Sequence, residues 1–111
     1  MMLKKDLRQF EVCKPIQIRD EDGAVYNEYA GPCGAFMGNI QPLSGKAAAE
    51  QFGIEMTRAY IIYTDDLETE IYEMYRLSGG SKVFEVKTVQ SWVNYRKLAC
   101  GEVILPDGES D

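Results

Sequence analysis

The chain has 111 residues, a length that predicts a single domain, and its 45% hydrophobic and 27% charged residues are typical of a globular protein. It contains no histidine, so the usual general base and the commonest zinc ligand are both missing. Its 18 acidic residues outnumber its 12 basic residues, and the net charge of −6 argues against a protein that wraps nucleic acid.

The first predicted element is a β-hairpin. Apolar and polar residues alternate over residues 10–18, which indicates a half-buried strand. Pro15 lies within this strand, and because proline cannot donate to a strand ladder, we expect an edge strand or a bulge there. Residues 20–23 end in Gly23 and predict a tight turn, after which a second strand over residues 25–29 returns along the first.

A third strand and a short helix are expected next. The strand is predicted over residues 33–41 and is expected to end at Pro42. Residues 44–52 predict the one α-helix, because Ser44 can cap its N-terminus and Gly53 is placed for the left-handed position after its C-terminus. So short a helix is marginal by itself, and we therefore expect it to dock on the sheet.

The rest of the chain is predicted to form β-structure. Strands are expected over residues 55–64, 70–77, 83–90 and 92–103, with a hairpin loop at residues 78–81. Phe84 and Val86 share one face of their strand and Val89 lies on the other, which predicts a β-bulge between them.

The expected fold is therefore mainly β. We predict a small antiparallel β-barrel or sandwich of six to seven strands with one short α-helix. This single domain spans residues 1–105, and residues 106–111 form a loose acidic tail.

No motif points to an enzyme, a metal site or a cofactor. Gly45 and Lys46 lack the earlier glycine and the following Ser or Thr of a phosphate-binding loop. The acidic residues over 65–70 lack the glycine of a calcium loop, so we interpret them as a solvated turn. The three cysteines have no histidine partner and are expected to be reduced thiols. No apolar run approaches the about 18 residues of a membrane span, and we expect no membrane partner.

The aromatic residues have two possible uses. Seven tyrosines, four phenylalanines and one tryptophan favour a packed core and protein interfaces. Aromatic rings on a small sheet can also stack nucleic-acid bases if a basic groove lies beside them. Such a strip is possible on neighbouring strands, from Lys82, Lys87, Arg96 and Lys97.

Two segments resemble those of a known family. Residues 35–53 hold a strand, Ile-Gln-Pro, Ser-Gly and a short Ala-rich helix that ends at a glycine. Residues 83–92 hold a strand of the form Phe-x-Val-x-x-Val that leads to a tryptophan. In this order and spacing they resemble the small head–tail joining proteins of tailed phages. The matching residues are Ile40, Gln41, Pro42, Ser44, Gly45, Phe84, Val86, Val89 and Trp92.

The resemblance implies a structural protein of phage or prophage origin and no catalysis. Such proteins are small β-barrels that form a ring below the portal and adaptor, extend the DNA channel, help retain packaged DNA and dock the tail. The implied partners are further copies of the chain, which form a ring on assembly and can be monomers alone. The others are portal and adaptor proteins, a tail-completion protein, and DNA that passes without specific binding. The implied location is the bacterial cytoplasm during assembly and then the head–tail junction.

Two other functions stay open beside this one. The chain is also consistent with a tail-terminator or tail-completion protein, or with a module that binds single-stranded nucleic acid. For the connector, the connections over residues 27–34 and 42–54 are the candidates for interface or channel loops. The residues concerned are Asn27, Tyr29, Pro32, Lys46, Glu50 and Gln51.

Overall fold

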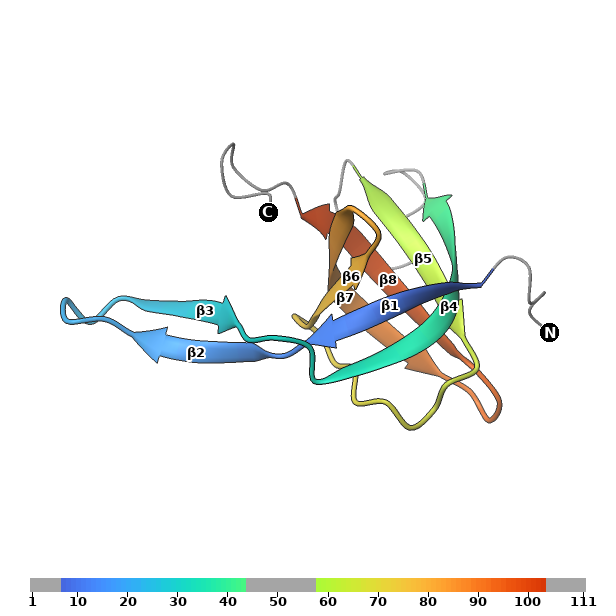
Figure 1. Cartoon of the computed structure of the whole chain (residues 1–111), viewed down its shortest axis with the longest axis horizontal. Coiled ribbons are helices and arrows are strands. Elements are labelled where there is room, and N and C mark those ends of the chain that lie inside the picture. Colours follow the sequence, from blue (N-terminus) through green and yellow to red (C-terminus); the bar gives the residue numbers. More distant parts are fainter. Residues whose placement is uncertain (1–6, 44–57, 104–111) are drawn as a thin grey trace.

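The structure is a computed structural model, and it describes residues 7–43 and 58–103 (Figure 1). These residues form an all-β fold of eight strands. In chain order the strands are β1 (Arg8–Cys13), β2 (Pro15–Arg19), β3 (Val25–Tyr29), β4 (Gly34–Leu43), β5 (Ala59–Thr64), β6 (Arg76–Gly79), β7 (Lys82–Ser91) and β8 (Arg96–Val103).

Six of the strands close into an antiparallel barrel in the order β1-β4-β5-β8-β7-β6. The predicted mainly-β fold and the barrel are confirmed. The predicted helix over residues 44–52 lies outside the described residues. No helix in the described part is long and apolar enough to cross a membrane.

The barrel is filled by alternate side chains of its strands. Phe10 lies at the centre, with its ring centroid 5.5 Å from that of Phe36 and 6.3 Å from that of Phe84. Gly79 makes room for this cluster, because a Cβ atom there would lie 2.7 Å from Cε1 of Phe10. The other fully buried large side chains include Val12, Ile62, Leu77, Val86 and Leu98.

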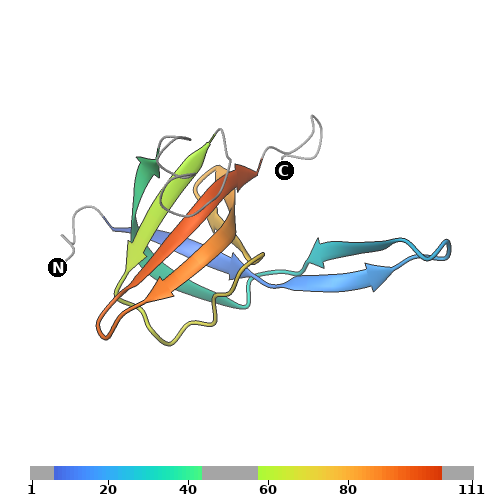
Figure 2. The same ribbon diagram turned by 180° about the vertical axis from the view of Figure 1, so that it is seen from behind.

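The remaining two strands form a separate hairpin, which we call the arm (residues 15–29). β2 and β3 pair only with each other and project from the barrel (Figures 1 and 2). The single strand predicted over residues 10–18 is therefore two strands, because the chain leaves the barrel between Cys13 and Pro15. The predicted edge position of Pro15 is confirmed, since both strands of a two-stranded sheet are edges.

The turn of the arm has the predicted form. The carboxylate of Asp20 accepts hydrogen bonds from the backbone N–H groups of Asp22 and Ala24, both at 2.9 Å. Gly23 has a φ of 84°, a conformation that glycine adopts without steric cost.

The prediction that Pro42 ends its strand is wrong, because β4 continues to Leu43. β1 pairs with β4 only as far as Gly38, whereas β5 pairs with residues 39–43. Beyond Gly38, one side of β4 therefore has no strand partner in the described part of the chain. A proline is tolerated at such an open edge.

Two of the later strands are shorter than predicted. The strand expected over residues 70–77 is confined to Arg76–Gly79, because a turn centred on Met74 precedes it. The strand expected from residue 92 begins at Arg96, because the N–H group of Trp92 donates to the carbonyl of Tyr95 and closes the β7–β8 hairpin. The predicted bulge is confirmed, since the pairing of β7 with β8 shifts between Val86 and Thr88.

Candidate functional site

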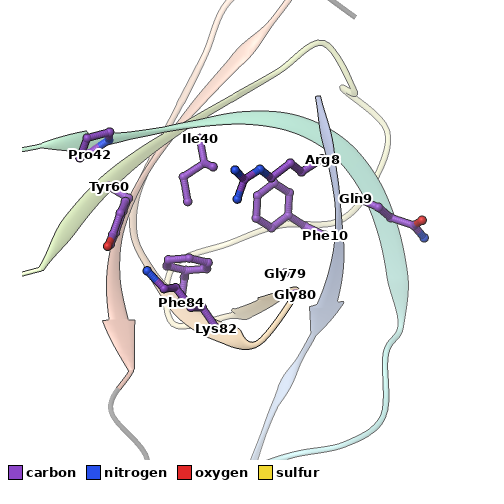
Figure 3. Close-up of a pocket in the computed structure, with 10 residues that line it drawn as sticks. All are labelled: Arg8, Gln9, Phe10, Ile40, Pro42, Tyr60, Gly79, Gly80, Lys82 and Phe84. Carbon is purple, nitrogen blue, oxygen red and sulfur yellow. The ribbon is translucent and has the colours of Figure 1, made fainter. Parts of the chain in front are cut away.

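The two ends of the barrel differ in chemistry. One end is formed where β1, β5 and β7 begin and β4, β6 and β8 finish, and we call it the mouth. Figure 3 shows the rings of Phe10 and Phe84 directed into the barrel there, whereas Gln9 points away from it. The mouth encloses a cavity of about 300 Å³. Its lining residues are Arg8, Gln9, Phe10, Ile40, Pro42, Tyr60, Gly79, Gly80, Lys82 and Phe84.

The mouth carries more positive than negative charge in the part that the structure describes. The carboxylate of Glu102 lies 3.6 Å from the guanidinium of Arg58 and 3.9 Å from the amino group of Lys82. It also accepts a hydrogen bond from the Tyr60 hydroxyl at 3.3 Å. Arg8 has no acidic partner among the described residues. Two cations thus flank the Glu102 carboxylate, and Arg8 lies in the lining of the same mouth. Among the described residues, the mouth therefore has a basic rim above the buried rings of Phe10 and Phe84.

The arm leaves the barrel from the end opposite the mouth. β1 begins at the mouth with Arg8 and finishes at Cys13, where the arm starts, and β4 returns from Gly34 to the mouth. The turn of the arm carries three successive acidic residues, Asp20, Glu21 and Asp22. Among the described residues, the acidic turn and the basic rim of the mouth therefore lie at opposite ends of the barrel.

One face of the arm is apolar. Ile16 and Ile18 lie on the same face of β2, and the register of the hairpin places Tyr26 opposite Ile18 and Glu28 opposite Ile16. Ile16 and Tyr26 are each 46% exposed. We call Ile16, Ile18 and Tyr26 the apolar face of the arm. On the other face, Val25 is 45% exposed.

The base of the arm is fixed to the barrel by polar contacts. The Tyr29 hydroxyl donates to the carbonyl of Met74 at 2.9 Å, and the guanidinium of Arg76 stacks 4.1 Å from the centre of the Tyr29 ring. Lys14 lies 3.4 Å from the Glu70 carboxylate. These contacts set the direction in which the arm projects.

Two carboxylates of the acidic run over residues 65–70 make hydrogen bonds and ion pairs within the fold. Burial by itself would raise the pKa of Asp66, but hydrogen bonds from Thr69 and Glu68 and the charge of Arg96 outweigh it and lower that pKa. Arg96 is only 7% exposed, and its Nε donates to the Asp66 carbonyl at 2.8 Å. The Asp66 carboxylate is therefore a cap for the loop and a counter-charge for a buried arginine.

A second pair in this loop is also structural. The Tyr75 hydroxyl donates to the Glu70 carboxylate, and this hydrogen bond together with burial raises the pKa of Tyr75 to about 12. The same hydrogen bond, with the charge of Lys14, lowers the pKa of Glu70. Tyr75 is 6% exposed and belongs to the core. The pair ties the loop to the barrel wall.

The structure brings some of the family-motif residues together. Ile40, Pro42 and Phe84 meet in the lining of the mouth. Gln41 lies between them on β4, paired with Ile61. Val86 is buried, and Val89 packs partly buried against the core.

The other predicted residues lie elsewhere or beyond the described part. Trp92 is 45% exposed at the opposite end, where its ring stacks on Tyr95 with the centroids 4.8 Å apart. Asn27 and Tyr29 belong to the arm, and Pro32 lies in the connection between β3 and β4. Five predicted residues lie outside the described part of the chain: Ser44, Gly45, Lys46, Glu50 and Gln51.

The possible basic strip is not a continuous groove. Lys82 lies at the mouth, whereas Arg96 is buried at the start of β8, at the opposite end. The amino group of Lys87 is 2.7 Å from the carboxylate of Glu85. The Lys97 amino group lies 6.0 Å from the centre of the Tyr63 ring.

Several mouth residues were not found from the sequence. Arg8, Tyr60, Gly79 and Gly80 come from separate strands and one turn, so no spacing along the chain relates them. Only closure of the barrel places them around one cavity. The sequence holds one weak signal for these residues, because Gly79 and Gly80 lie in the hairpin loop predicted at residues 78–81.

Comparisons with known proteins extend the description of the fold. No protein-family model matches the chain, and no curated protein matches it. The solution structure of a protein from Shigella flexneri 2a is similar, with a TM-score of 0.62 and 13% sequence identity. The alignment covers 92% of this chain and 93% of that one. At this identity the similarity establishes a shared fold.

Proposed function

We propose that this chain is a subunit of the head–tail connector of a tailed phage or prophage. In this role, copies of the chain form a ring below the portal and adaptor, extend the DNA channel, help to retain the packaged DNA and dock the tail. The subunit is made in the bacterial cytoplasm and ends at the head–tail junction. The role needs no catalytic residue, metal or cofactor.

The observation that carries the proposal is the arm. A two-stranded hairpin is at best marginally stable alone, yet this one projects from the barrel with Ile16, Val25 and Tyr26 each close to half exposed. Apolar side chains on a projecting element are typical of a surface that another protein covers. A small barrel with such an arm suits a subunit that functions within an assembly.

The charge and the sequence motifs support the same role. A net charge of −6 suits a channel subunit along which DNA phosphates slide without being held. The Ile-Gln-Pro motif and the Phe-x-Val-x-x-Val strand resemble those of head–tail joining proteins, and residues from both line the mouth.

The direct test is electron microscopy of the purified chain mixed with the portal and adaptor proteins of the same phage. We expect an added ring of density on the side of the adaptor that faces the tail. Correctly folded components that form only the portal–adaptor complex would contradict the proposal. A ring that binds isolated tail tubes and not the adaptor would instead identify a tail-terminator or tail-completion protein.

A second candidate function is the binding of single-stranded nucleic acid. The observation that favours it is the mouth, where the Lys82 amino group lies 5.7 Å from the centre of the Tyr60 ring and Arg8 lies nearby. Gel-shift measurements with a single-stranded oligonucleotide test it. Binding that falls steeply with added salt would support this candidate over the connector.

A further inference from the structure

We propose that the arm of one copy docks at the mouth of the next copy, so that copies associate head to tail. In this contact the acidic turn lies beside Arg8 and Lys82, and the apolar face of the arm covers Ile40, Pro42 and Tyr60 at the mouth. The inference rests on the proposed function, because it names the surfaces through which copies in the ring meet.

The arm is built as one half of a contact. Its apolar face is open to solvent in the single chain, and both of its strands have a free edge. Exposed edges and apolar faces are the features through which strands associate with another chain. The polar contacts of Tyr29 and Lys14 hold the base of the arm, so the face is presented in a fixed direction.

The mouth has the complementary properties. It is concave, with a cavity of about 300 Å³, and the partly exposed Ile40, Pro42 and Tyr60 supply apolar surface within it. In the described part of the chain its rim carries Arg8, together with Arg58 and Lys82 on either side of the Glu102 carboxylate. A basic rim attracts the acidic turn, and opposite charges across an interface fix the register of a contact.

The placement of the two surfaces determines the kind of assembly. A contact between different surfaces of identical subunits is head to tail, and it closes into a ring when the rotation between neighbours permits. The arm and the mouth lie at opposite ends of the barrel, so one subunit cannot satisfy its own contact. A second copy of this chain is therefore the occupant that the charges and the topology favour.

The test measures self-association of the full chain by sedimentation over a range of concentrations. The turn variant is Glu21→Lys with Asp22→Lys, which leaves Asp20 to hold the turn. The mouth variant is Arg8→Glu, since Arg8 has no acidic partner in the described part of the chain. The matched control is Glu68→Lys with Glu73→Lys, two exposed residues that change the net charge as much as the turn variant does.

We expect the wild type and the control to associate equally, and each of the other variants to associate roughly tenfold more weakly. A chain that carries both the turn and the mouth changes should regain most of the lost affinity for self-association, because the turn is then basic and position 8 is acidic. Melting temperatures of all variants show that each one folds. A wild type that stays monomeric to about millimolar concentration would overturn the proposal, as would equal losses in the control.

Chemical cross-linking gives a second readout of the same contact. A carbodiimide joins a carboxylate directly to an amine, so we expect a link between Asp22 of one copy and Lys82 of another. Mixing chains of light and heavy nitrogen identifies links between copies by mass. Absence of that link from an associated sample would place the contact elsewhere and overturn the inference.

The outcomes separate this inference from the proposed function. If the Arg8→Glu and turn variants still build the ring on the portal and adaptor, the connector role stands and the arm–mouth contact is refuted. If Arg8→Glu instead abolishes oligonucleotide binding and leaves self-association unchanged, the mouth is a nucleic-acid site and both proposals fail.

Discussion

At the scale of single residues, the barrel depends on a few close approaches that only small side chains permit. Gly79 faces the Phe10 ring, and Gly38 lies where a Cβ atom would be 2.9 Å from Cγ2 of Ile62. Both glycines border the central aromatic cluster. The sequence shows where these glycines stand but not which side chain each one faces, because Phe10 and Ile62 come from other strands.

Replacement of Gly79 with alanine is expected to destabilise the barrel. The added methyl group overlaps the Phe10 ring and forces it out of its stack with Phe36, so we expect a loss of about 1–3 kcal/mol of unfolding free energy. Urea denaturation measures it. Gly31→Ala is the control, because no atom lies within 4 Å of a Cβ there. Equal stability of the two variants would show that the ring moves freely.

Asp66 makes the stability of the folded chain depend on pH in the acid range. The pKa of Asp66 is lower in the folded protein than in the unfolded chain. The ionised carboxylate therefore adds to the free energy of unfolding at pH values above the unfolded-state pKa. This added stability is lost as the pH falls through the folded-state pKa. We expect Asp66→Asn to cost about 1–3 kcal/mol near neutral pH and to flatten the acid side of the stability profile. Melting temperatures from about pH 7 to about pH 2 test this. A variant whose profile parallels the wild type would contradict it.

The cysteines should differ in reactivity. Cys33 is exposed, whereas Cys100 is fully buried and burial raises its pKa to about 12. Since the thiolate is the reactive form, iodoacetamide should modify Cys33 in the folded protein and Cys100 only after unfolding. Mass spectrometry of the peptides over time measures both. Early modification of Cys100 would mean that the barrel opens readily.

At the scale of elements, local signals identified the hairpins and the acidic turn after β5, but missed that the loop continues as far as β6. The arm was predictable because its alternation, its Asp-Gly turn and its return strand lie within twenty residues. Residues 70–75 were predicted as part of a strand, but side-chain hydrogen bonds and one unusual backbone conformation replace the strand ladder in this loop. Asp66 caps the N–H groups of Glu68 and Thr69, and Met74 adopts a φ of 75°, which its residue type does not signal.

The arm should open more readily than the barrel. In a dilute monomer, the backbone hydrogen bonds of β2 and β3 have no packed core behind them, whereas β5 and β8 each pair with two strands and carry buried side chains. We expect amide hydrogens of the arm to exchange roughly a hundredfold faster than those around Ile62 and Leu98. Hydrogen exchange with mass spectrometry measures both regions in one sample. Equal protection would show that the arm is stable without a partner.

At the scale of the whole molecule, the charges of the described residues are unevenly distributed. The arm ends in three acidic residues, and the opposite end of the barrel carries the cations of the mouth. The composition gives only the net charge, whereas the topology shows that acidic and basic residues of the described part lie at opposite ends of the barrel. The fold class was predictable from hairpin signals, but the mouth was not, because its residues come from strands that meet only on closure of the barrel.

We propose that the chain joins phage heads to tails, and deletion of its gene from the genome that encodes it tests this proposal most directly. Electron microscopy of the lysate gives the measurement, with a plasmid copy of the gene as the control. We predict heads that lack tails and have lost DNA, together with free tails, and normal virions when the plasmid is present. Intact tailed virions from the deletion strain would contradict the account.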